Sequence, residues 1–186
     1  EGMEHVVVFG GGIIGTLNAM VARAHGAKCV TVMDVSQDRL DLLDKLDLPV
    51  DNFVNSGESD PEAWVAEHTN GRGVDAVVVA ASVKQLVPVG IRMLARAGHL
   101  SIFAGMPKSD PVESIDLNPI HYRELNVHGA NSSAYDAYLK ARDLLTTGKI
   151  EGSRLVTHTF SLSDFNKAIE TQRDPSTGAL KVVIIP

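Results

Sequence analysis

The chain has 186 residues, of which 44% are hydrophobic and 22% are charged, and its formal net charge is −6 at pH 7. This composition is ordinary for a globular protein, and the length fits one domain, or one domain with part of another. The acidic balance argues against nucleic acid as a partner, which would call for a basic stripe. We find neither a signal peptide nor an apolar run near the roughly 18 residues of a membrane span, so we expect a cytoplasmic protein with no membrane contact.

Cys29 is the only cysteine of the chain, and it lies in the strand-like run AKCVTVMD. A single cysteine excludes an internal disulfide and any zinc site built from several cysteines of this chain. We interpret Cys29 as a small buried apolar side chain, in keeping with a reducing compartment.

Short β-branched runs alternate with segments of helical period over the first 130 residues. Valine-rich strands separated by helices are typical of a parallel sheet that is covered on both faces. We therefore predict an α/β fold with a doubly wound, six-stranded parallel sheet, the Rossmann fold. The expected strands are 5–9, 28–33, 52–55, one within 71–81, 99–105 and 125–129; the expected helices are 13–25, one that opens at the N-cap Ser36, one from Asp60-Pro61 to 69, and 84–96.

The pattern changes after residue 130, where the regular alternation of strand and helix stops. We predict a Rossmann domain over 1–130 and a separate C-terminal segment over 131–186. In that segment we expect helices at 134–147 and 163–172 and strands at 154–160 and 179–185.

The stretch VVVFGGGIIGTLNA contains Gly10-x-Gly12-x-x-Gly15 between the first strand and the first helix. Gly10 permits a tight turn, Gly12 lets a pyrophosphate approach the backbone, and Gly15 lets the helix lie close to the sheet. The pyrophosphate would then meet the free N–H groups and the positive end of the helix. Because strand, helix and spacing are all in place, we favour a dinucleotide site over a turn that binds nothing.

Asp34 stands at the end of the second strand, where a carboxylate can accept hydrogen bonds from both hydroxyls of the adenosine ribose. It would repel a 2′-phosphate, so we expect NAD rather than NADP. Arg39 follows one and a half helical turns later, within reach of the ribose or of a phosphate.

Other dehydrogenase classes fit less well. Short-chain enzymes place a lysine four residues after the reactive tyrosine, whereas here Asn126, Leu139 and Arg142 follow the three tyrosines at that spacing. Nothing marks the histidine, arginine and aspartate set of a lactate-type enzyme.

The segments VVVFGGGIIG, GRGVDAVVVAA, LARAGHLSIFAG, HYRELNVHG and FNKAIE with the closing GALKVVIIP follow one another in a specific order. With Asp34 and with Arg39-Leu40 between them, they resemble the zinc-dependent medium-chain alcohol and polyol dehydrogenases, the group that includes sorbitol and threonine dehydrogenases. The resemblance covers essentially the whole chain.

The resemblance implies that the catalytic domain, a GroES-like barrel with every zinc ligand, would lie upstream of Glu1. The chain would then be the NAD-binding part, and 131–186 would return to complete the absent domain. We expect it to bind NAD, to hold no zinc and no catalytic residue, and to be inactive alone. The complete enzyme would oxidise a secondary alcohol or sugar alcohol as a homodimer or homotetramer, pairing through an edge strand at 111–117.

The resemblance also implies a set of cofactor contacts. Around the pyrophosphate turn lie Gly10, Gly12, Ile13, Ile14 and Gly15, and Asp34 and Arg39 flank the adenosine ribose. Lys181 would meet the pyrophosphate as a point charge. The remaining contacts are Ala80 and Ala81 at the cleft and, around the nicotinamide, Ala104, Met106, Ala130 and Ser132.

Three alternatives stay open. A regulatory Rossmann module would sense NAD or another nucleotide without catalysis, and a zinc-free quinone-reductase-like relative would use NADPH and lack the acid at position 34. His121 and Glu124 have a spacing that suits a metal pair, but no third ligand is evident. We interpret that pair as surface or packing residues.

Overall fold

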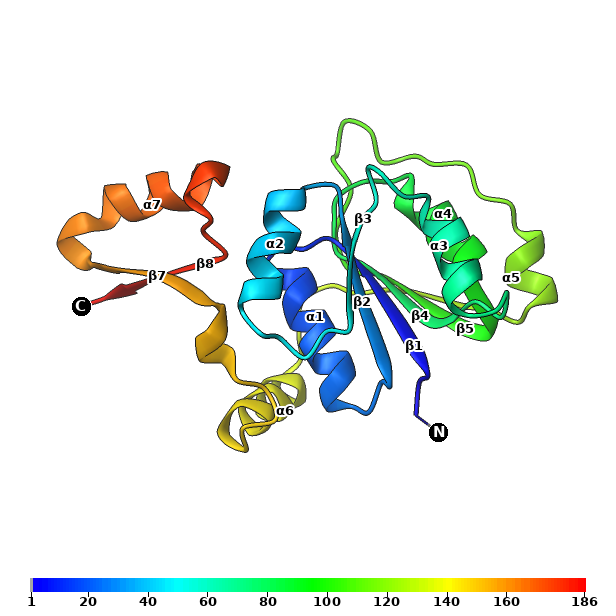
Figure 1. The fold of residues 1–186 in the computed structure, drawn as a ribbon, viewed down its shortest axis with the longest axis horizontal. Helices are drawn as coiled ribbons and strands as arrows, with labels where there is room; N and C mark the ends of the chain where they lie inside the picture. The colour runs from blue at the N-terminus through cyan, green and yellow to red at the C-terminus, as the bar shows by residue number, and fades with distance from the viewer. Residues whose placement is uncertain (1) are drawn as a thin grey trace.

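A computed structural model, which describes residues 2–186, shows an α/β fold around a six-stranded parallel sheet (Figure 1). The strand order is β3-β2-β1-β4-β5-β6. The first three strands run from the middle of the sheet to one edge, and the last three run from the middle to the other edge. This is the doubly wound Rossmann order, and it confirms the predicted fold class. The strands are β1 (His5–Phe9), β2 (Cys29–Asp34), β3 (Asn52–Asn55), β4 (Val74–Val79), β5 (Leu94–Ile102) and β6 (Asn126–Gly129).

Helices cover both faces of this sheet, with α1 and α2 on one side and α3, α4 and α5 on the other (Figure 1). Side chains alternate between the two faces of a strand. In β1, Val6 and Val8 therefore join the core under α1 and α2, while Val7 and Phe9 join the core under α3 and α4. The helices are α1 (Ile13–Ala24), α2 (Gln37–Lys45), α3 (Pro61–His68), α4 (Leu86–Met93) and α5 (Asn118–Tyr122).

Two of the predicted helix starts are confirmed by side-chain caps. The Ser36 hydroxyl accepts a hydrogen bond from the Arg39 N–H at 3.3 Å at the start of α2. At the start of α3, the Asp60 carboxylate accepts from two backbone N–H groups at 2.8 and 3.1 Å, ahead of Pro61. Such caps satisfy N–H groups that have no partner within the helix.

Residues 131–186, here called the tail, form a separate two-stranded parallel sheet, β7 with β8, beside the main body (Figure 1). Ile150, Leu155 and Leu180 are buried and belong to the core under α1 and α2, so the tail is attached there. The tail elements are α6 (Tyr135–Thr146), η1 (Gly152–Leu155), β7 (Val156–Ser161), η2 (Leu162–Asp164), α7 (Phe165–Arg173), η3 (Pro175–Thr177) and β8 (Lys181–Ile185).

Two sequence predictions need correction. The helix expected over 84–96 ends at Met93, because Leu94 already pairs with β4 and begins β5 ahead of the expected strand 99–105. The register then shifts, and Ala97 takes a left-handed backbone with φ 58°. The segment 111–117, expected as an edge strand, forms no strand, and the main sheet ends at β6. Within 2–186, every helix is too short or too polar to cross a bilayer.

Candidate dinucleotide site

The glycine turn between β1 and α1 is too crowded for side chains at two of its positions. A β-carbon on Gly15 would lie 1.8 Å from the carbonyl oxygen of Gly10. Gly10 itself has φ 106°, and a β-carbon there would lie 3.3 Å from the backbone of Ala80. The turn therefore brings α1 against the ends of β1 and β4 only because both residues are glycine.

Gly12, in contrast, faces open space, because a β-carbon there would meet nothing within 4 Å. It is the N-cap of α1, and no side chain caps this helix or places an acid in its first turn. Helices α2 and α3 both have a capping side chain and an acid there. The start of α1 thus combines free N–H groups, positive dipole and access, which are the requirements of a phosphate site.

Asp34 is fixed beside this turn by two backbone donors. Its Oδ2 accepts a hydrogen bond from the Gly11 N–H at 2.6 Å, and its Oδ1 accepts from the Ser36 N–H at 2.9 Å. Each carboxylate oxygen can accept more than one hydrogen bond. The carboxylate is therefore oriented by the backbone and still able to receive a pair of hydroxyl donors.

A hollow of about 120 Å³ opens next to Asp34, where the carboxyl ends of β1, β2 and β4 meet. This is the point at which the strand order reverses, the usual ligand position in such sheets. Val35 and Val83 are 73% and 45% exposed at its rim, so apolar side chains border an open slot. The lining residues are Phe9, Gly10, Met33, Asp34, Val35, Ser56, Ala81, Val83 and Leu86.

The sequence interpretation missed part of this lining, namely Phe9, Met33, Val35, Ser56, Val83 and Leu86. Val35 and Val83 could have been found, because an apolar residue just beyond the end of a sheet strand often faces the ligand crevice. Ser56 follows the expected strand 52–55, but its place beside Asp34 depends on how β3 pairs with β2.

The predicted residues of the turn have different environments. Ile13 packs against the core under α1, whereas Ile14 is 46% exposed. Ala81 lines the hollow, and Ala80 donates its N–H to the Phe9 carbonyl at 2.9 Å. Ile14 and Ala81 are therefore accessible, while Ile13 and Ala80 mainly support the turn.

The residues predicted around the nicotinamide follow two adjacent strand ends. Ala104 donates its N–H to the Val79 carbonyl at 2.9 Å, and Ala130 donates to the Ile102 carbonyl at 3.1 Å. Met106 packs against the core under α4, and Ser132 is exposed with φ 60°. The four residues thus follow β5 and β6 on the same carboxyl edge as the glycine turn.

The side chains of Arg39 and Lys181 both lie at the tail. The Arg39 guanidinium donates to the carbonyl oxygen of Ala179 at 3.1 Å, which places it against the tail. Lys181 is exposed at the start of β8. A contact of Lys181 with a pyrophosphate remains a prediction.

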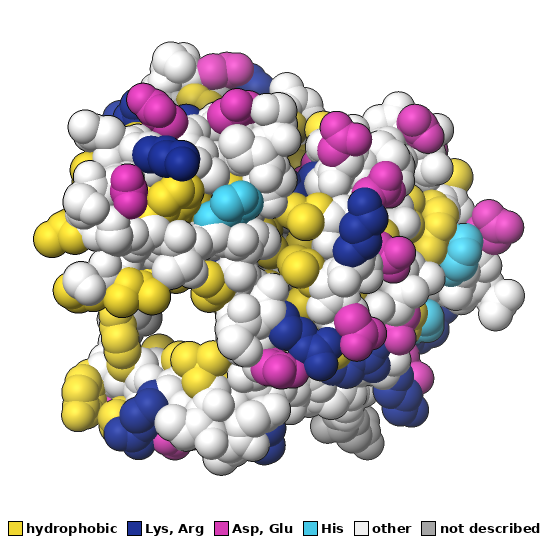
Figure 2. Space-filling view, turned by 60° about the vertical axis from the view of Figure 1, so that its left-hand side comes forward, with side chains coloured by type: hydrophobic (Ala, Val, Ile, Leu, Met, Phe, Trp, Pro, Cys, Tyr) yellow, Lys and Arg dark blue, Asp and Glu magenta, His cyan; other side chains and the backbone are white. Residues whose placement is uncertain are grey.

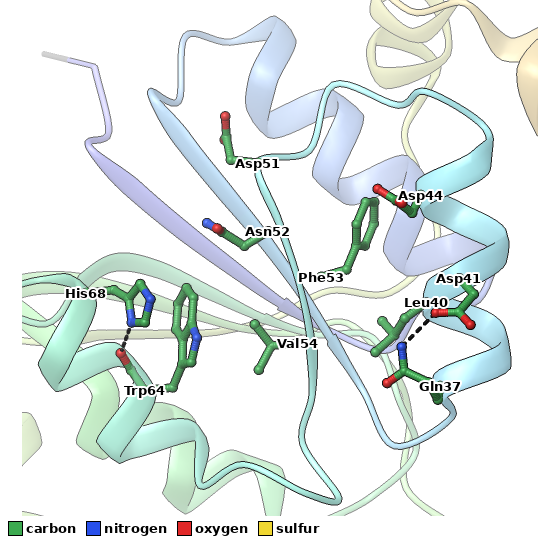
Figure 3. Close-up of a pocket in the computed structure, with 10 residues that line it drawn as sticks. All are labelled: Gln37, Leu40, Asp41, Asp44, Asp51, Asn52, Phe53, Val54, Trp64 and His68. Carbon is green, nitrogen blue, oxygen red and sulfur yellow. Dashed lines mark hydrogen bonds between the residues drawn. The ribbon is translucent and has the colours of Figure 1, made fainter.

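A larger hollow of about 430 Å³ lies along the edge strand β3, which is the neighbour of β2 (Figure 3). Its side chains come from α2, β3 and α3, with the rings of Trp64 and His68 stacked 3.8 Å apart. Asp51, on its border, already accepts a hydrogen bond from the Val30 N–H at 2.6 Å and pairs with Arg23. None of the predicted cofactor contacts lines this hollow, so we do not include it in the site.

Two residues of the HYRE segment make contacts with β5 and the end of α4. Arg123 donates to the carbonyls of Ile91, Arg92 and Leu94 at 3.0, 3.2 and 2.7 Å, which caps the end of α4. Glu124 pairs with Arg96 on the surface. Over residues 2–186 no three histidine, cysteine or acidic side chains come together in a way that could hold a metal ion. The described residues therefore do not fit a zinc ion.

A known protein family matches most of this chain. The model of the family described as zinc-binding dehydrogenase matches residues 14–147, which include most of the sheet and the start of the tail. The chain belongs to the zinc-binding dehydrogenase family. The matched residues begin within α1 and include Asp34.

The relatives that the chain matches are about twice as long. The chain is 30% identical over 184 residues to a sorbitol dehydrogenase of Halalkalibacterium halodurans and 31% identical over 183 residues to an L-threonine 3-dehydrogenase of Bacillus licheniformis. Each alignment covers 97% of this chain and 51% of the relative. An alcohol dehydrogenase of Thermotoga maritima superposes with a TM-score of 0.85 at 27% identity, over 98% of this chain and 50% of the other. The chain thus spans about half the length of the relatives it matches.

Proposed function

We propose that the chain binds NAD along the carboxyl edge of its main sheet and orients it for hydride transfer within a larger zinc-type alcohol or polyol dehydrogenase. The observation that carries the proposal is the carboxylate of Asp34, held by the N–H groups of Gly11 and Ser36 beside an uncapped helix start. A carboxylate at this place pairs with the two hydroxyls of an adenosine ribose and repels a 2′-phosphate.

The three parts of an adenosine diphosphate find matching surfaces around this carboxylate. The pyrophosphate meets the open backbone at Gly12 and the N-terminus of α1. The adenine ring enters the slot bordered by Val35 and Val83, which is too small for more than one part of the cofactor. These surfaces are contiguous because β1, β2 and β4 are neighbours in the sheet.

The nicotinamide half would extend over the ends of β5 and β6, past Ala104 and Ala130. When bound, NAD supplies the hydride acceptor, and the chain supplies its position and orientation. Because residues 2–186 offer no metal cluster, activation of the alcohol would come from outside the described residues. The chain alone should therefore bind the cofactor without turnover.

We further propose that residues 1–130 are the cofactor domain and that the tail packs on the other half of the enzyme. Helix α6 supports this division, since Tyr135 and Tyr138 are 77% and 72% exposed and none of its residues is buried. On the side that carries the tail, hydrophobic side chains border an open hollow (Figure 2). Large exposed apolar groups of this kind mark surfaces that a partner covers.

The proposed substrate class is inferred from two relatives, which are named sorbitol dehydrogenase and L-threonine 3-dehydrogenase. We propose a secondary alcohol, with a polyol ahead of an amino-acid alcohol, and a homo-oligomeric enzyme. A purely regulatory nucleotide sensor is disfavoured, because the alignments with dehydrogenases cover 97% of the chain and so include the tail.

Titration with NADH, followed by the change in its fluorescence, tests the proposal. We expect saturable binding by the wild-type chain and strong loss of binding in Gly12→Val, whose side chain would occupy the open space at the helix start. Unchanged binding in that variant, or no binding by the wild-type chain, would reject the proposed site. Oxidation of sorbitol or threonine by the chain alone would reject the proposal that the chain binds the cofactor without turnover.

A further inference from the structure

The hollow along the edge strand β3 has no part in the proposed function. Its volume of about 430 Å³ lies within the range of small-molecule sites in proteins. β3 pairs with β2 alone, so within residues 2–186 no further strand covers its outer edge. Helix α2 stands on one side of this edge and α3 on the other (Figure 3). This recess, here called the β3 hollow, is therefore open to a ligand that lies along the strand.

The α2 wall of the β3 hollow is acidic. Gln37, Asp41 and Asp44 follow one another at steps of four and three residues, which puts them on one face of the helix. Asp51, just ahead of β3, brings a third carboxylate to the border. None of the ten side chains that line the hollow is a lysine or an arginine. Apart from His68, the ionisable groups that line it are all carboxylates.

The three carboxylates differ in how far neighbouring groups compensate their charge. Asp51 forms an ion pair with Arg23, and Asp41 accepts a hydrogen bond from the Gln37 amide at 2.7 Å. Neither Asp41 nor Asp44 forms an ion pair with a basic side chain of residues 2–186. Two negative charges thus remain on this wall without a cation, and they attract cations and repel phosphate and other anions.

The spacing of these carboxylates excludes a single metal ion as the occupant. Within residues 2–186, no three histidine, cysteine or acidic side chains converge closely enough to hold one. The charges are instead distributed, from two successive turns of α2 to the residue before β3. A ligand with several cationic groups along its length can meet them at the same time, whereas a single ion cannot.

The α3 wall of the β3 hollow is aromatic. Trp64 and His68 lie one helical turn apart, and their rings stack with centroids 3.8 Å apart and 13° between the planes. His68 Nδ1 lies 2.8 Å from the Trp64 carbonyl oxygen, which can only accept, so Nδ1 is the donor. The Nε2 of a neutral His68 ring is then an acceptor for a further donor. Together with Phe53 of β3, this wall offers aromatic rings and one acceptor, which suit an ammonium group and the methylene groups next to it.

We propose that the β3 hollow binds an aliphatic polyamine, a chain of methylene groups that carries two or more ammonium groups. The ammonium groups pair with the carboxylates of Asp41 and Asp44, and the methylene groups between them lie over Phe53 and Trp64. Charge complementarity selects a cation, and the separation of the carboxylates selects a ligand with separated charges. The polyamine site is independent of NAD, because none of the predicted cofactor contacts lines the hollow.

Trp64 is the only tryptophan of the chain, so its fluorescence reports directly on the β3 hollow. We expect spermidine, titrated into the wild-type chain at low salt and without NADH, to change this fluorescence saturably with a Kd of about 1 mM or lower. Butylamine, which carries a single ammonium group, should bind at least about tenfold more weakly. No saturable change with spermidine, equal binding of butylamine, or the same change with magnesium chloride at equal concentration would overturn the proposal, since a response to any cation needs no built site.

Two double variants of equal net charge test the residues themselves. Asp41→Asn/Asp44→Asn removes two carboxylates of the β3 hollow, and we expect it to weaken spermidine binding on the order of tenfold. Asp38→Asn/Asp136→Asn removes two exposed carboxylates that do not line the hollow, and it should change the Kd by less than about twofold. All four side chains are exposed, so both variants should fold as the wild type does. Equal weakening in the two double variants would assign the effect to net charge and would overturn the proposal.

Discussion

The carbonyl oxygen of Gly10 lies 1.8 Å from the place where a β-carbon on Gly15 would be. Gly15→Ala therefore forces the glycine turn and α1 apart, and we expect it to lower the free energy of unfolding by about 3 kcal/mol or more, at the upper end for overpacking. Gly12→Ala is the control, since its methyl group enters open space and should change stability by about 0.5 kcal/mol at most. Urea unfolding of the two variants checks this, and equal midpoints would contradict it.

Asp75 ties the start of β1 to β4 and should make stability depend on pH. Partial burial alone would raise the pKa of its carboxyl, but hydrogen bonds from Arg72 and from the N–H groups of residues 4 and 5 bring this pKa below its ordinary 3.8. A lowered folded-state pKa stabilises the protein above the unfolded pKa, and this stabilisation is lost as the pH falls through the folded value.

The test compares Asp75→Asn with Asp44→Asn, an exposed aspartate of α2. At pH 7 the first variant should be less stable than wild type, and the difference should shrink as the pH falls below 3.8. Asp44→Asn should follow the wild-type curve. A difference between Asp75→Asn and wild type that grew toward low pH would have the wrong sign.

Arg123 caps α4 with three hydrogen bonds to carbonyls, a pattern that a lysine cannot reproduce. We expect Arg123→Lys to lower the free energy of unfolding by about 2 kcal/mol, the scale of hydrogen bonds to a charged group. Arg96→Lys changes a surface pair with Glu124 whose side chains are 70% and 63% exposed, and it should cost about 0.5 kcal/mol or less. Thermal unfolding would contradict the account if both variants behaved alike.

The thiol of Cys29 should react slowly with disulfide reagents. Burial raises the pKa of its thiol above the ordinary 9.0, and the nearby carboxylate of Asp51 raises it further. A smaller thiolate fraction at a given pH means slower attack on a disulfide reagent. We expect the native chain to react with Ellman's reagent at pH 8 more slowly than glutathione does, and to accelerate as the pH rises. A rate equal to that of glutathione would disprove this.

The fold was predictable because its signals are local. The strand at 52–55 has the predicted limits, and Ser36 and Asp60 cap the helices that their sequence context predicts. The start of β5 was not predictable, since it depends on a left-handed alanine at position 97 and a register shift against β4. Neither feature leaves a mark in a single sequence.

In the site, too, the local motif was predictable and the tertiary contacts were not. The glycine turn and Asp34 form a motif of fixed spacing, and the structure brings both to the switch point of the sheet. The rest depends on tertiary contacts. Ser56 comes to the slot through the pairing of β3 with β2, and the carbonyl that binds Arg39 is contributed by Ala179 in the tail. No sequence periodicity joins such residues.

Isothermal titration calorimetry of NADH into the wild-type chain and into Asp34→Ala tests the central claim most directly. The account predicts a single saturable site in the wild type and a loss of affinity on the order of tenfold or more in the variant, which lacks the acceptor of the ribose hydroxyls. Equal affinity of the two proteins, or no heat of binding from the wild type, would contradict it.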